Sequence, residues 1–414
     1  MAKQMMRQKL LTSVKIRGVE FPNRIVLSPM QMYEAKSDGR MTDWHLVHLG
    51  KFASANFGAV FTEVLCVEKR GRSTYSDAGI WSDRHVPQLK KIADFIRAQG
   101  SVPAAQIGHC GPKSSRQRPY DGLQPLSRIE GDDAEKPWDI VSCSDIPAAP
   151  GYDTPRALSR SAVKSLVRKF GAAARRCDQA GFDVLDVHAA HGYLIHSFLS
   201  PLSNFRTDEY GGSEANRNRF AVEIAREIRK YWPADKPLFF RLSCIDRFAG
   251  GLEIENTINL SRSLKDEGVD VIDCSSGGIK GPNSLFSLAS KEPPSPGFQV
   301  PFAEEIRKQA DMATMAVGMI IDPDQANSII EDGKADLVAL GREALSNPNW
   351  PLHAMRALHE DRSYEDWPPN IGWWLEVRQR MLQSSNPDDW KVGPAAQNTP
   401  KRAASAQSTA PAGE

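Results

Sequence analysis

Short apolar runs recur along the chain, and each is too short to form a helix. Most are rich in aliphatic or β-branched residues, and Gly, Pro, Ser or polar residues bound them. Because neighbouring positions within a run are apolar, both faces of each element should be buried. The runs predict eight strands, at 24–29, 59–64, 102–107, 182–187, 238–243, 269–274, 314–320 and 337–341.

Segments with helical periodicity separate these runs. In 86–98 the apolar residues Leu89, Ile92 and Ile96 fall on one face, and Gly100 follows as a stop signal. Alternating strands and helices indicate a parallel sheet covered by helices, and eight strands favour an α/β fold closed as a (β/α)8 TIM barrel. A doubly wound open sheet is the alternative. The other predicted helices are 161–180, 218–232, 255–267, 302–310 and 324–331.

Several segments lie outside this repeat. Residues 15–21 predict an N-terminal hairpin, and residues 111–160 form a long insertion after the third strand. The repeat defines a main domain over 1–360, followed by a Trp-containing C-terminal extension over 361–395. The Ala/Ser/Pro-rich stretch 396–414 predicts a disordered tail.

Composition narrows the class of protein. The chain has 414 residues, is 41% hydrophobic and 25% charged, and carries a formal net charge of +1, which makes no electrostatic case for binding nucleic acid or an anionic membrane. No apolar run approaches the roughly 18 residues that span a bilayer, and the N-terminus lacks an apolar signal core. The six cysteines include no Cys-x-x-Cys, which argues against an iron–sulfur or zinc centre and for a cytoplasmic protein with reduced thiols.

The stretch 184–193 concentrates hydrogen-bonding side chains where the fourth strand ends. His188 and His191 stand three residues apart, and Tyr193 follows. We expect the two imidazoles to hold a substrate oxygen and the phenol to deliver a proton. A metal-binding pair is the alternative, but no cysteine lies at ligand spacing, and Asp186 on the same strand is a more suitable partner for a buried cation.

Other strands also end in polar residues or glycines, at the edge where such a barrel places its chemistry. Arg241 is either a fixed positive charge beside an electron-rich cofactor or part of an internal salt bridge, with Asp186 as a partner. Gln106 is either a core amide or a donor–acceptor pair for the edge of a planar heterocycle. Gly318, Gly341 and Arg342 predict a phosphate-binding site. The alternative is that the glycines form plain turns and Arg342 forms a surface ion pair.

Several motifs resemble the Old Yellow Enzyme family, in its thermophilic-like branch, which includes xenobiotic reductases. They cover most of the chain and stand at 23–33, 79–82, 186–201, 204–212, 272–277 and 340–343. The blocks His-Ala-Ala-His-Gly-Tyr and Arg-Thr-Asp-Glu-Tyr-Gly-Gly are the most specific. The resemblance implies an FMN-binding barrel that takes hydride from NADPH or NADH. Its expected substrate is a small electrophile, such as an α,β-unsaturated carbonyl, whose C=C bond is reduced.

The resemblance also implies roles for individual residues. His188 and His191 would bind the substrate carbonyl, and Tyr193 would protonate the product. Tyr33 would assist at the substrate oxygen. The implied cofactor-binding residues are Ser28, Pro29, Met30, Gln31, Val64, Gln106, Arg241, Gly318, Gly341 and Arg342.

The chain departs from the family pattern at two places. Gln31 stands where the branch usually has a cysteine that bonds the flavin edge, so the reduction potential and pocket volume should differ. The segment 110–113 reads Cys-Gly-Pro-Lys where the family often has Ala-Gly-Arg-Lys. The resemblance further implies a homodimer or homotetramer, in which Trp373 or Trp374 enters a neighbour's pocket or packs on its own barrel.

Two rival functions remain. An oxidative dehydrogenase or demethylase would use the same flavin to cleave a C–N or C–S bond. Relatives of that kind often carry a cysteine-rich iron–sulfur segment and a second nucleotide domain, and we expect neither here. A non-enzymatic barrel that only holds a phosphate ligand would not need the His-His-Tyr set.

Overall fold

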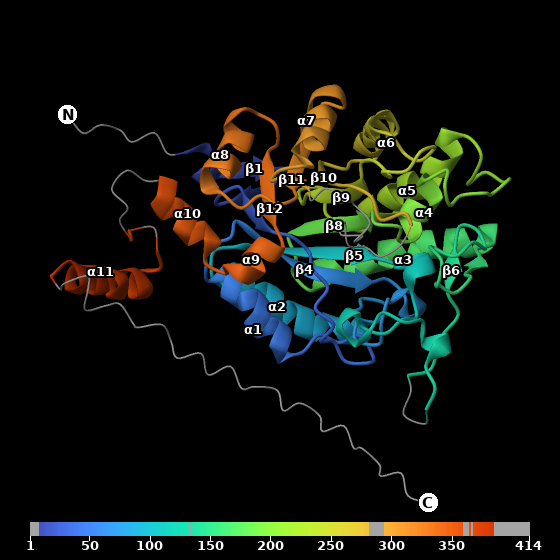
Figure 1. Ribbon diagram of the computed structural model, residues 1–414, viewed down its shortest axis with the longest axis horizontal. Coiled ribbons are helices and arrows are strands. Elements are labelled where there is room, and N and C mark those ends of the chain that lie inside the picture. The colour runs from blue at the N-terminus through green and yellow to red at the C-terminus, as the bar shows by residue number, and fades with distance from the viewer. Residues whose placement is uncertain (1–7, 132–134, 281–293, 359–363, 366, 385–414) are drawn as a thin grey trace, which may run out of the picture. The chain divides into compact units, whose positions relative to one another are not determined.

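The computed structural model describes residues 8–131, 135–280, 294–358, 364–365 and 367–384. Eight parallel strands form a closed barrel, in which β12 pairs with β3 to complete the ring (Figure 1). The (β/α)8 barrel is therefore confirmed, and the open-sheet alternative is wrong. In barrel order the strands are β3 (Ile25–Leu27), β4 (Ala59–Cys66), β5 (Val102–Gly108), β8 (Val184–Ala189), β9 (Leu238–Ser243), β10 (Val271–Ser275), β11 (Ala313–Val317) and β12 (Leu337–Leu340).

Helices surround the barrel and cover the outer faces of its strands (Figure 1). Three of them begin at side-chain caps, since Ser159, Ser213 and Asp322 each accept a hydrogen bond from a first-turn backbone N–H. The helices of the barrel unit are α1 (Asp43–Ala53), α2 (Val86–Ala98), α3 (Arg160–Gln179), α4 (Leu194–Leu199), α5 (Glu214–Arg229), α6 (Ile254–Asp266), α7 (Val300–Gln309), α8 (Pro323–Glu331), α9 (Arg342–Ser346) and α10 (Trp350–Leu358).

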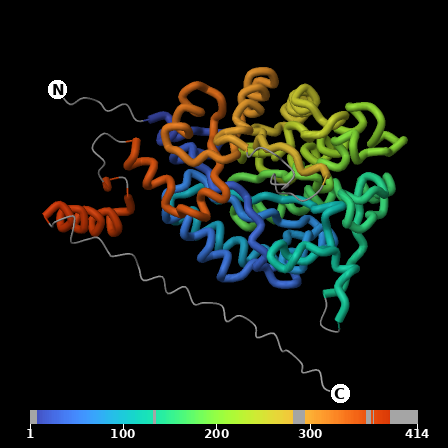
Figure 2. Tube along the Cα trace, viewed as in Figure 1, coloured from blue at the N-terminus to red at the C-terminus, as the bar shows by residue number. Residues whose placement is uncertain are grey.

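The predicted helices correspond to α2, α3 and α5–α8, with starts that differ by up to four residues. Helix α1 has no counterpart among them. It buries His45 and His48 beside its apolar residues, so its inner face does not read as an apolar stripe. Figure 2 shows the chain passing around the barrel in sequence order, from blue at β3 to orange at β12.

An N-terminal hairpin fills the amino-terminal end of the barrel. Strands β1 (Val14–Ile16) and β2 (Val19–Phe21) pair antiparallel, which confirms the predicted hairpin. The Phe21 side chain is fully buried and stacks on Phe239 of β9, with ring centroids 6.5 Å apart. Phe61 also packs against Phe239 in the same apolar cluster. This end of the barrel is thus closed by apolar packing, and chemistry is confined to the opposite end.

Polar residues form a layer above that apolar cluster. In the strand register Gln106 lies beside Asp186, and Arg241 lies between His188 and Asp273. All five residues are at most 8% exposed. A buried polar layer at this height requires mutual partners or a ligand, because an unpaired buried charge is costly.

The insertion after β5 has little regular structure. Its described part contains three short 3-10 helices and the two-residue strands β6 (Val141–Ser142) and β7 (Arg156–Ala157), which pair in parallel. Arg206 anchors the insertion by donating hydrogen bonds to the carbonyls of Cys143 and Leu158.

The chain divides into two compact units, Met1–Arg362 and Ser363–Glu414. Within the second unit, α11 (Pro369–Gln383) is a helix, and the Tyr364 and Trp367 rings meet edge to face. The predicted tail 396–414 lies outside the described residues. Among the helices of the described ranges, none combines the length and the apolar character needed to cross a bilayer.

Candidate active site

A two-lobed cavity lies at the carboxyl ends of the strands. One lobe has a volume of about 410 Å³ and the other about 390 Å³. The two adjoin, since six residues line both. The structure brings all fourteen site residues predicted from the sequence into this cavity. Ser28 and Gly341 line the first lobe; Gln31, Tyr33, Val64, Gln106, His188, His191 and Tyr193 line the second; Pro29, Met30, Arg241, Gly318 and Arg342 line both.

The two histidines form a hydrogen-bonded chain across the second lobe. His188 Nε2 lies 3.2 Å from His191 Nδ1, and His191 Nε2 lies 2.7 Å from the Ser275 hydroxyl. The backbone N–H of Ala190 donates to His188 Nδ1, which places the His188 ring proton on Nε2. His191 Nδ1 then accepts that proton's hydrogen bond, and His191 Nε2 donates to Ser275. Each imidazole therefore presents an N–H in a defined direction.

Both imidazoles are held in the neutral form. Burial lowers the pKa of His188 well below its ordinary value, and the positive charge of Arg241 acts in the same direction. Burial and the neighbouring His188 lower the pKa of His191 well below its ordinary value too. A neutral imidazole can donate one hydrogen bond without bringing a full charge to the substrate.

Tyr193 lies against this pair. Its ring centroid is 4.6 Å from that of His188, and only 3% of the residue is exposed. Its hydroxyl donates a 3.0 Å hydrogen bond to Gln31 Oε1. Burial raises the pKa of Tyr193 well above its usual value, so the phenol keeps its proton at neutral pH.

Two of the four predicted catalytic residues have left-handed backbone conformations. Tyr33 has φ 61° and His191 has φ 61°, which is uncommon for residues with bulky side chains. The His191 backbone is held from two sides. Its N–H donates to the Ser243 hydroxyl, and its carbonyl accepts a hydrogen bond from Lys113 Nζ at 2.7 Å. Such strain persists only where neighbouring contacts hold it, and it occurs often at functional sites.

Arg241 pairs with Asp273 and not with Asp186, the partner named for the salt-bridge alternative. Its Nε lies 3.4 Å from Asp273 Oδ2, and its Nη1 donates to the Ser28 hydroxyl. The proposed partner Asp186 instead accepts a 2.7 Å hydrogen bond from Gln106 Nε2. The reason is register, because Arg241 is the direct neighbour of Asp273 on the adjoining strand.

This polar layer has hydrogen-bonding capacity that the protein itself does not use. Within the described residues, Gln31 Nε2, Arg241 Nε and Asp186 Oδ1 are buried and have no hydrogen-bond partner. Two buried carboxylates share one guanidinium, and burial raises the pKa of both Asp186 and Asp273. A bound group with donors and acceptors along one edge would satisfy such atoms.

The opposite end of the cavity has a different character. Gly318 has φ +123°, and a Cβ there would lie 2.8 Å from Gln299 Nε2, so only glycine fits. At Gly341 a Cβ would meet only Met30 and Ser28, at ordinary contact distances of 3.5 Å or more. Arg342 follows directly and is exposed at the rim. Accessible backbone beside an arginine suits an anionic group.

The two ends together test whether FMN fits. The glycine and arginine end suits a phosphate, and the layer with unused amide and guanidinium donors suits a planar heterocycle with polar edges. The two lobes adjoin and share lining residues, which suits one elongated ligand that spans both. The residues present therefore fit the group.

Four supporting residues were not predicted from the sequence. Ser243 and Ser275 orient His191 through its backbone and its ring, Lys113 holds its carbonyl, and Asp273 pairs with Arg241. Both serines end their strands, so their position at the catalytic edge was visible in the sequence. Which side chains these four residues contact depends on the strand register, and the sequence alone does not give that register.

A barrel with this two-ended cavity, a neutral histidine pair and a buried phenol defines a flavin-dependent oxidoreductase. Comparison with known proteins supports this class. Residues 9–361 match the family described as NADH:flavin oxidoreductase / NADH oxidase. The NADPH dehydrogenase of Bacillus subtilis (strain 168) is 42% identical over 358 residues, which cover 86% of this chain and 97% of that one. The NADPH dehydrogenase of Geobacillus sp. (strain WCH70) is 40% identical over 354 residues, covering 85% and 95%.

Solved structures agree with these relatives in fold. A 2-naphthoyl-CoA reductase complex superposes with a TM-score of 0.73 at 25% identity; 84% of this chain is covered, and the chain spans about half (52%) of that protein. Morphinone reductase superposes with a TM-score of 0.68 at 23% identity, covering 88% of this chain and 97% of that one. The chain belongs to the NADH:flavin oxidoreductase / NADH oxidase family, the Old Yellow Enzyme family. It is an oxidoreductase that uses FMN, with NAD(P)H as the reductant.

Proposed function

We propose that this enzyme is an ene-reductase, which reduces the C=C bond of an α,β-unsaturated carbonyl or a related electrophile. The observation that carries the proposal is the grouping of His188, His191 and Tyr193 in one cavity lobe that adjoins Arg241. Bound FMN, reduced by NADPH or NADH, supplies the hydride. The protein must then hold the substrate oxygen and supply a proton.

The histidine pair would bind the substrate oxygen. Both rings are neutral and face the lobe. A small ring rotation would turn the His188 N–H from His191 Nδ1, and the His191 N–H from the Ser275 hydroxyl, toward an incoming oxygen. Negative charge develops on that oxygen as the hydride reaches Cβ. Fixed donors in a water-poor pocket stabilise such charge, and removal of one costs about 3–4 kcal/mol in known oxyanion sites. Tyr33, which lines the same lobe, would assist at this oxygen.

Tyr193 would donate the proton to Cα. Its raised pKa keeps the hydroxyl protonated until the carbanion develops. In the resting state the hydroxyl is aimed at Gln31, so the proton must leave that hydrogen bond to reach the substrate. Gln31 therefore holds the Tyr193 hydroxyl in the resting state, and it also lies where the flavin edge is expected.

The cofactor-binding roles follow the two ends of the cavity. We assign the phosphate to Gly318, Gly341 and Arg342. Arg241 and Gln106 would face the polar edge of the flavin, with Arg241 supplying positive charge near the reduced ring. The remaining residues assigned to flavin contact are Ser28, Pro29, Met30, Gln31 and Val64.

Anaerobic stopped-flow kinetics tests the proposal, because the two half-reactions are separable. His188→Ala should retain FMN and its reduction by NAD(P)H but lose about 100-fold or more in kcat/KM for an enone. Tyr193→Phe should slow enone reduction and leave FMN reduction unchanged. Phe298→Leu, a change at the rim of the same lobe, is the matched control and should affect both steps little.

The outcomes discriminate between functions. Full enone activity in His188→Ala, or equal loss of both half-reactions in Tyr193→Phe, would refute the assigned roles. A substrate panel should include nitro compounds and amines beside enones. Bleaching of the flavin by an amine without NAD(P)H would favour the oxidative dehydrogenase instead.

We also propose that the enzyme is a homodimer or homotetramer in which α11 contacts a second copy. The helix exposes four large apolar side chains: Ile371, Trp373, Trp374 and Met381. Such a patch is typical of an interaction surface. Light scattering of the double variant Trp373→Gln/Trp374→Gln should show a smaller particle than the wild type; an unchanged mass would exclude these residues from the contact.

The location that we propose is a reducing cytoplasm. All six cysteines are free and buried. Disulfides form and persist in oxidising compartments, so a chain with six unpaired thiols fits a reducing one. Cell fractionation with an activity assay checks this assignment.

A further inference from the structure

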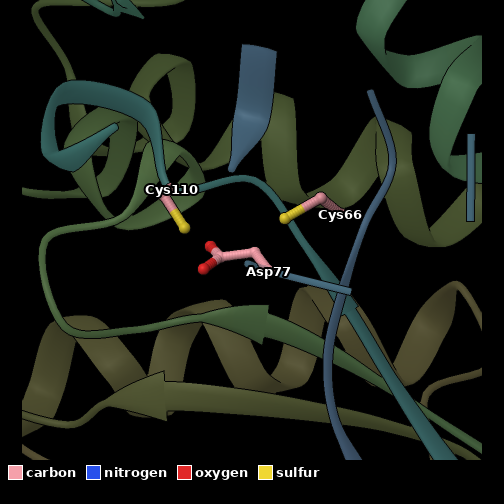
Figure 3. Close-up of side chains that lie close together, drawn as sticks. All are labelled: Cys66, Asp77 and Cys110. Atoms are coloured by element: carbon pink, nitrogen blue, oxygen red, sulfur yellow. The ribbon is translucent and has the colours of Figure 1, made fainter. Parts of the chain in front are cut away.

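Two of the six cysteines meet beside a buried carboxylate. Cys66 ends β4, Asp77 lies in the loop that follows, and Cys110 lies just beyond β5 (Figure 3). The cysteines are 44 positions apart in the sequence, so spacing along the chain does not reveal the group. Within the part of the chain that the structure describes, this is the one group of three residues placed to hold a metal ion.

Backbone hydrogen bonds hold the three segments together. The Cys66 N–H donates to the Ala78 carbonyl, and the Ile80 N–H donates back to the Cys66 carbonyl, which fixes the Asp77 loop against β4. The Cys110 N–H donates to the Gly71 carbonyl. The group is therefore built on a rigid frame, and no side chain must cross from a mobile segment.

The charge at this position is not balanced by the protein. Asp77 is fully buried, and its oxygens accept hydrogen bonds from the Ser73 N–H and the Thr74 hydroxyl. Among the described residues it forms no ion pair. Arg72, a buried arginine five positions before Asp77, does not pair with the carboxylate. Its guanidinium donates hydrogen bonds to three backbone carbonyls. A buried carboxylate without a cation is costly unless one binds there.

The geometry suits a small tetrahedral ion. The two sulfurs and a carboxylate oxygen all lie within 4.8 Å of one another. Two sulfurs that each bind zinc at about 2.3 Å can be at most about 4.6 Å apart, and about 3.8 Å apart in a tetrahedron. The sulfur–sulfur distance therefore needs to shorten by about an ångström or less for both thiolates to bind one zinc ion. Figure 3 shows both cysteine side chains directed toward the Asp77 side chain.

We propose that Cys66, Asp77 and Cys110 bind a thiophilic divalent cation of the zinc class. Two thiolates and one carboxylate select such an ion over Mg²⁺ or Ca²⁺, which prefer oxygen ligands. On binding, both S–H bonds break, two S–metal bonds and one O–metal bond form, and two protons leave to solvent. Three protein ligands leave one tetrahedral position for a further ligand. The proposal does not rest on the proposed ene-reductase reaction, although the group adjoins the catalytic residues, since Cys110 and Asp77 both act on the pKa of Tyr193.

Metal analysis of the reduced, FMN-loaded full chain tests the proposal. After equilibration with Zn²⁺ and gel filtration, we expect one zinc per chain in the wild type. Cys66→Ala and Cys110→Ala should each retain less than a tenth of that amount. Cys177→Ala removes a buried thiol in α3 and is the matched control, which should bind as the wild type does. FMN content and far-ultraviolet circular dichroism verify folding.

Co²⁺ provides a spectroscopic readout of the ligands. We expect visible bands of tetrahedral cobalt beyond the flavin absorption, and their loss in Cys66→Ala. Should a cysteine variant not fold, Asp77→Asn preserves the side-chain size and one of the two accepted hydrogen bonds while removing the ligand charge, and should bind Co²⁺ at least tenfold more weakly. The absence of stoichiometric binding, or binding unchanged by all three substitutions, overturns the proposal.

Thiol counting tests the alternative that Cys66 and Cys110 form a disulfide rather than a metal site. Protein purified without reductant and then unfolded should present six titratable thiols after metal removal. Four thiols, rising to six with reductant, together with peptide mapping that links Cys66 to Cys110 rather than Cys244 to Cys274, would show a disulfide at the proposed site and would also overturn it.

Discussion

Removal of the Arg241 charge should destabilise the barrel in a pH-dependent way. Arg241→Met keeps much of the side-chain volume but deletes the guanidinium. Asp273 and Asp186, both fully buried, then have no cation in the layer. The Gln106 amide still serves Asp186, whereas neither Asp273 oxygen has a hydrogen-bond partner among the described residues. The cost should therefore fall chiefly on Asp273.

The structure sets the size of the effect. The Arg241 Nε to Asp273 Oδ2 distance is 3.4 Å. At an effective dielectric constant of about 20, two unit charges at that separation attract by about 5 kcal/mol. Breaking a buried ion pair by removing one partner costs about 3–5 kcal/mol. We expect a loss of that order in the free energy of unfolding at pH 8.

The loss should shrink at acid pH. Burial already raises the folded-state pKa of Asp273 in the wild type, and loss of the Arg241 charge should raise it further above its unfolded value of about 3.9. A raised folded pKa contributes stability that is present below the unfolded pKa and is lost as the pH increases through the folded one. Each pH unit in that window changes the free energy by about 1.4 kcal/mol. Between pH 8 and pH 5.5 the variant should recover much of its deficit.

Urea denaturation of the flavin-free protein at both pH values measures the effect, since lost flavin contacts then play no part. Arg241→Met/Asp273→Asn should restore most of the stability at pH 8, because the uncompensated carboxylate is gone. Arg241→Lys keeps the charge and serves as the control. A loss below about 1 kcal/mol at pH 8, or equal losses at both pH values with no rescue, would refute the reasoning.

Three further predictions concern catalysis. Ser275→Ala removes the partner of the His191 ring and should lower enone kcat/KM about fivefold, a change of about 1 kcal/mol, with FMN reduction unchanged; equal effects on both half-reactions would contradict it. Gln31→Ala removes the hydrogen bond that the Tyr193 hydroxyl donates to Gln31 and should raise the rate of enone reduction by up to about fivefold in single-turnover experiments, whereas a decrease would show that Gln31 aims the donor. Because the pKa of both His188 and His191 is lowered well below its ordinary value, the oxidative half-reaction should show no acid limb near pH 6.5; a limb there would indicate that a charged imidazole forms.

Much of the architecture is readable from local patterns. An apolar run such as 238–243 indicates a strand that is buried on both faces. Eight such strands that alternate with amphipathic helices are compatible with only a few folds, and the (β/α)8 barrel is one of them. The catalytic edge follows as well, because polar residues such as His188 and glycines such as Gly341 stand where their strands end. All fourteen predicted site residues do line one cavity. Helix α1 was missed because His45 and His48 occupy positions that apolar residues usually take.

Partnerships across strands came only from the folded chain. Asp186 was named as the partner if Arg241 formed an internal salt bridge, but register sets Asp273 beside it. The link between Gln31 and Tyr193 joins residues 162 positions apart, and Cys66 meets Cys110 across neighbouring strands. Periodicity reports which face of an element is buried. Which side chains then meet depends on register, strand order and barrel closure, and these depend on interactions distributed over the whole chain.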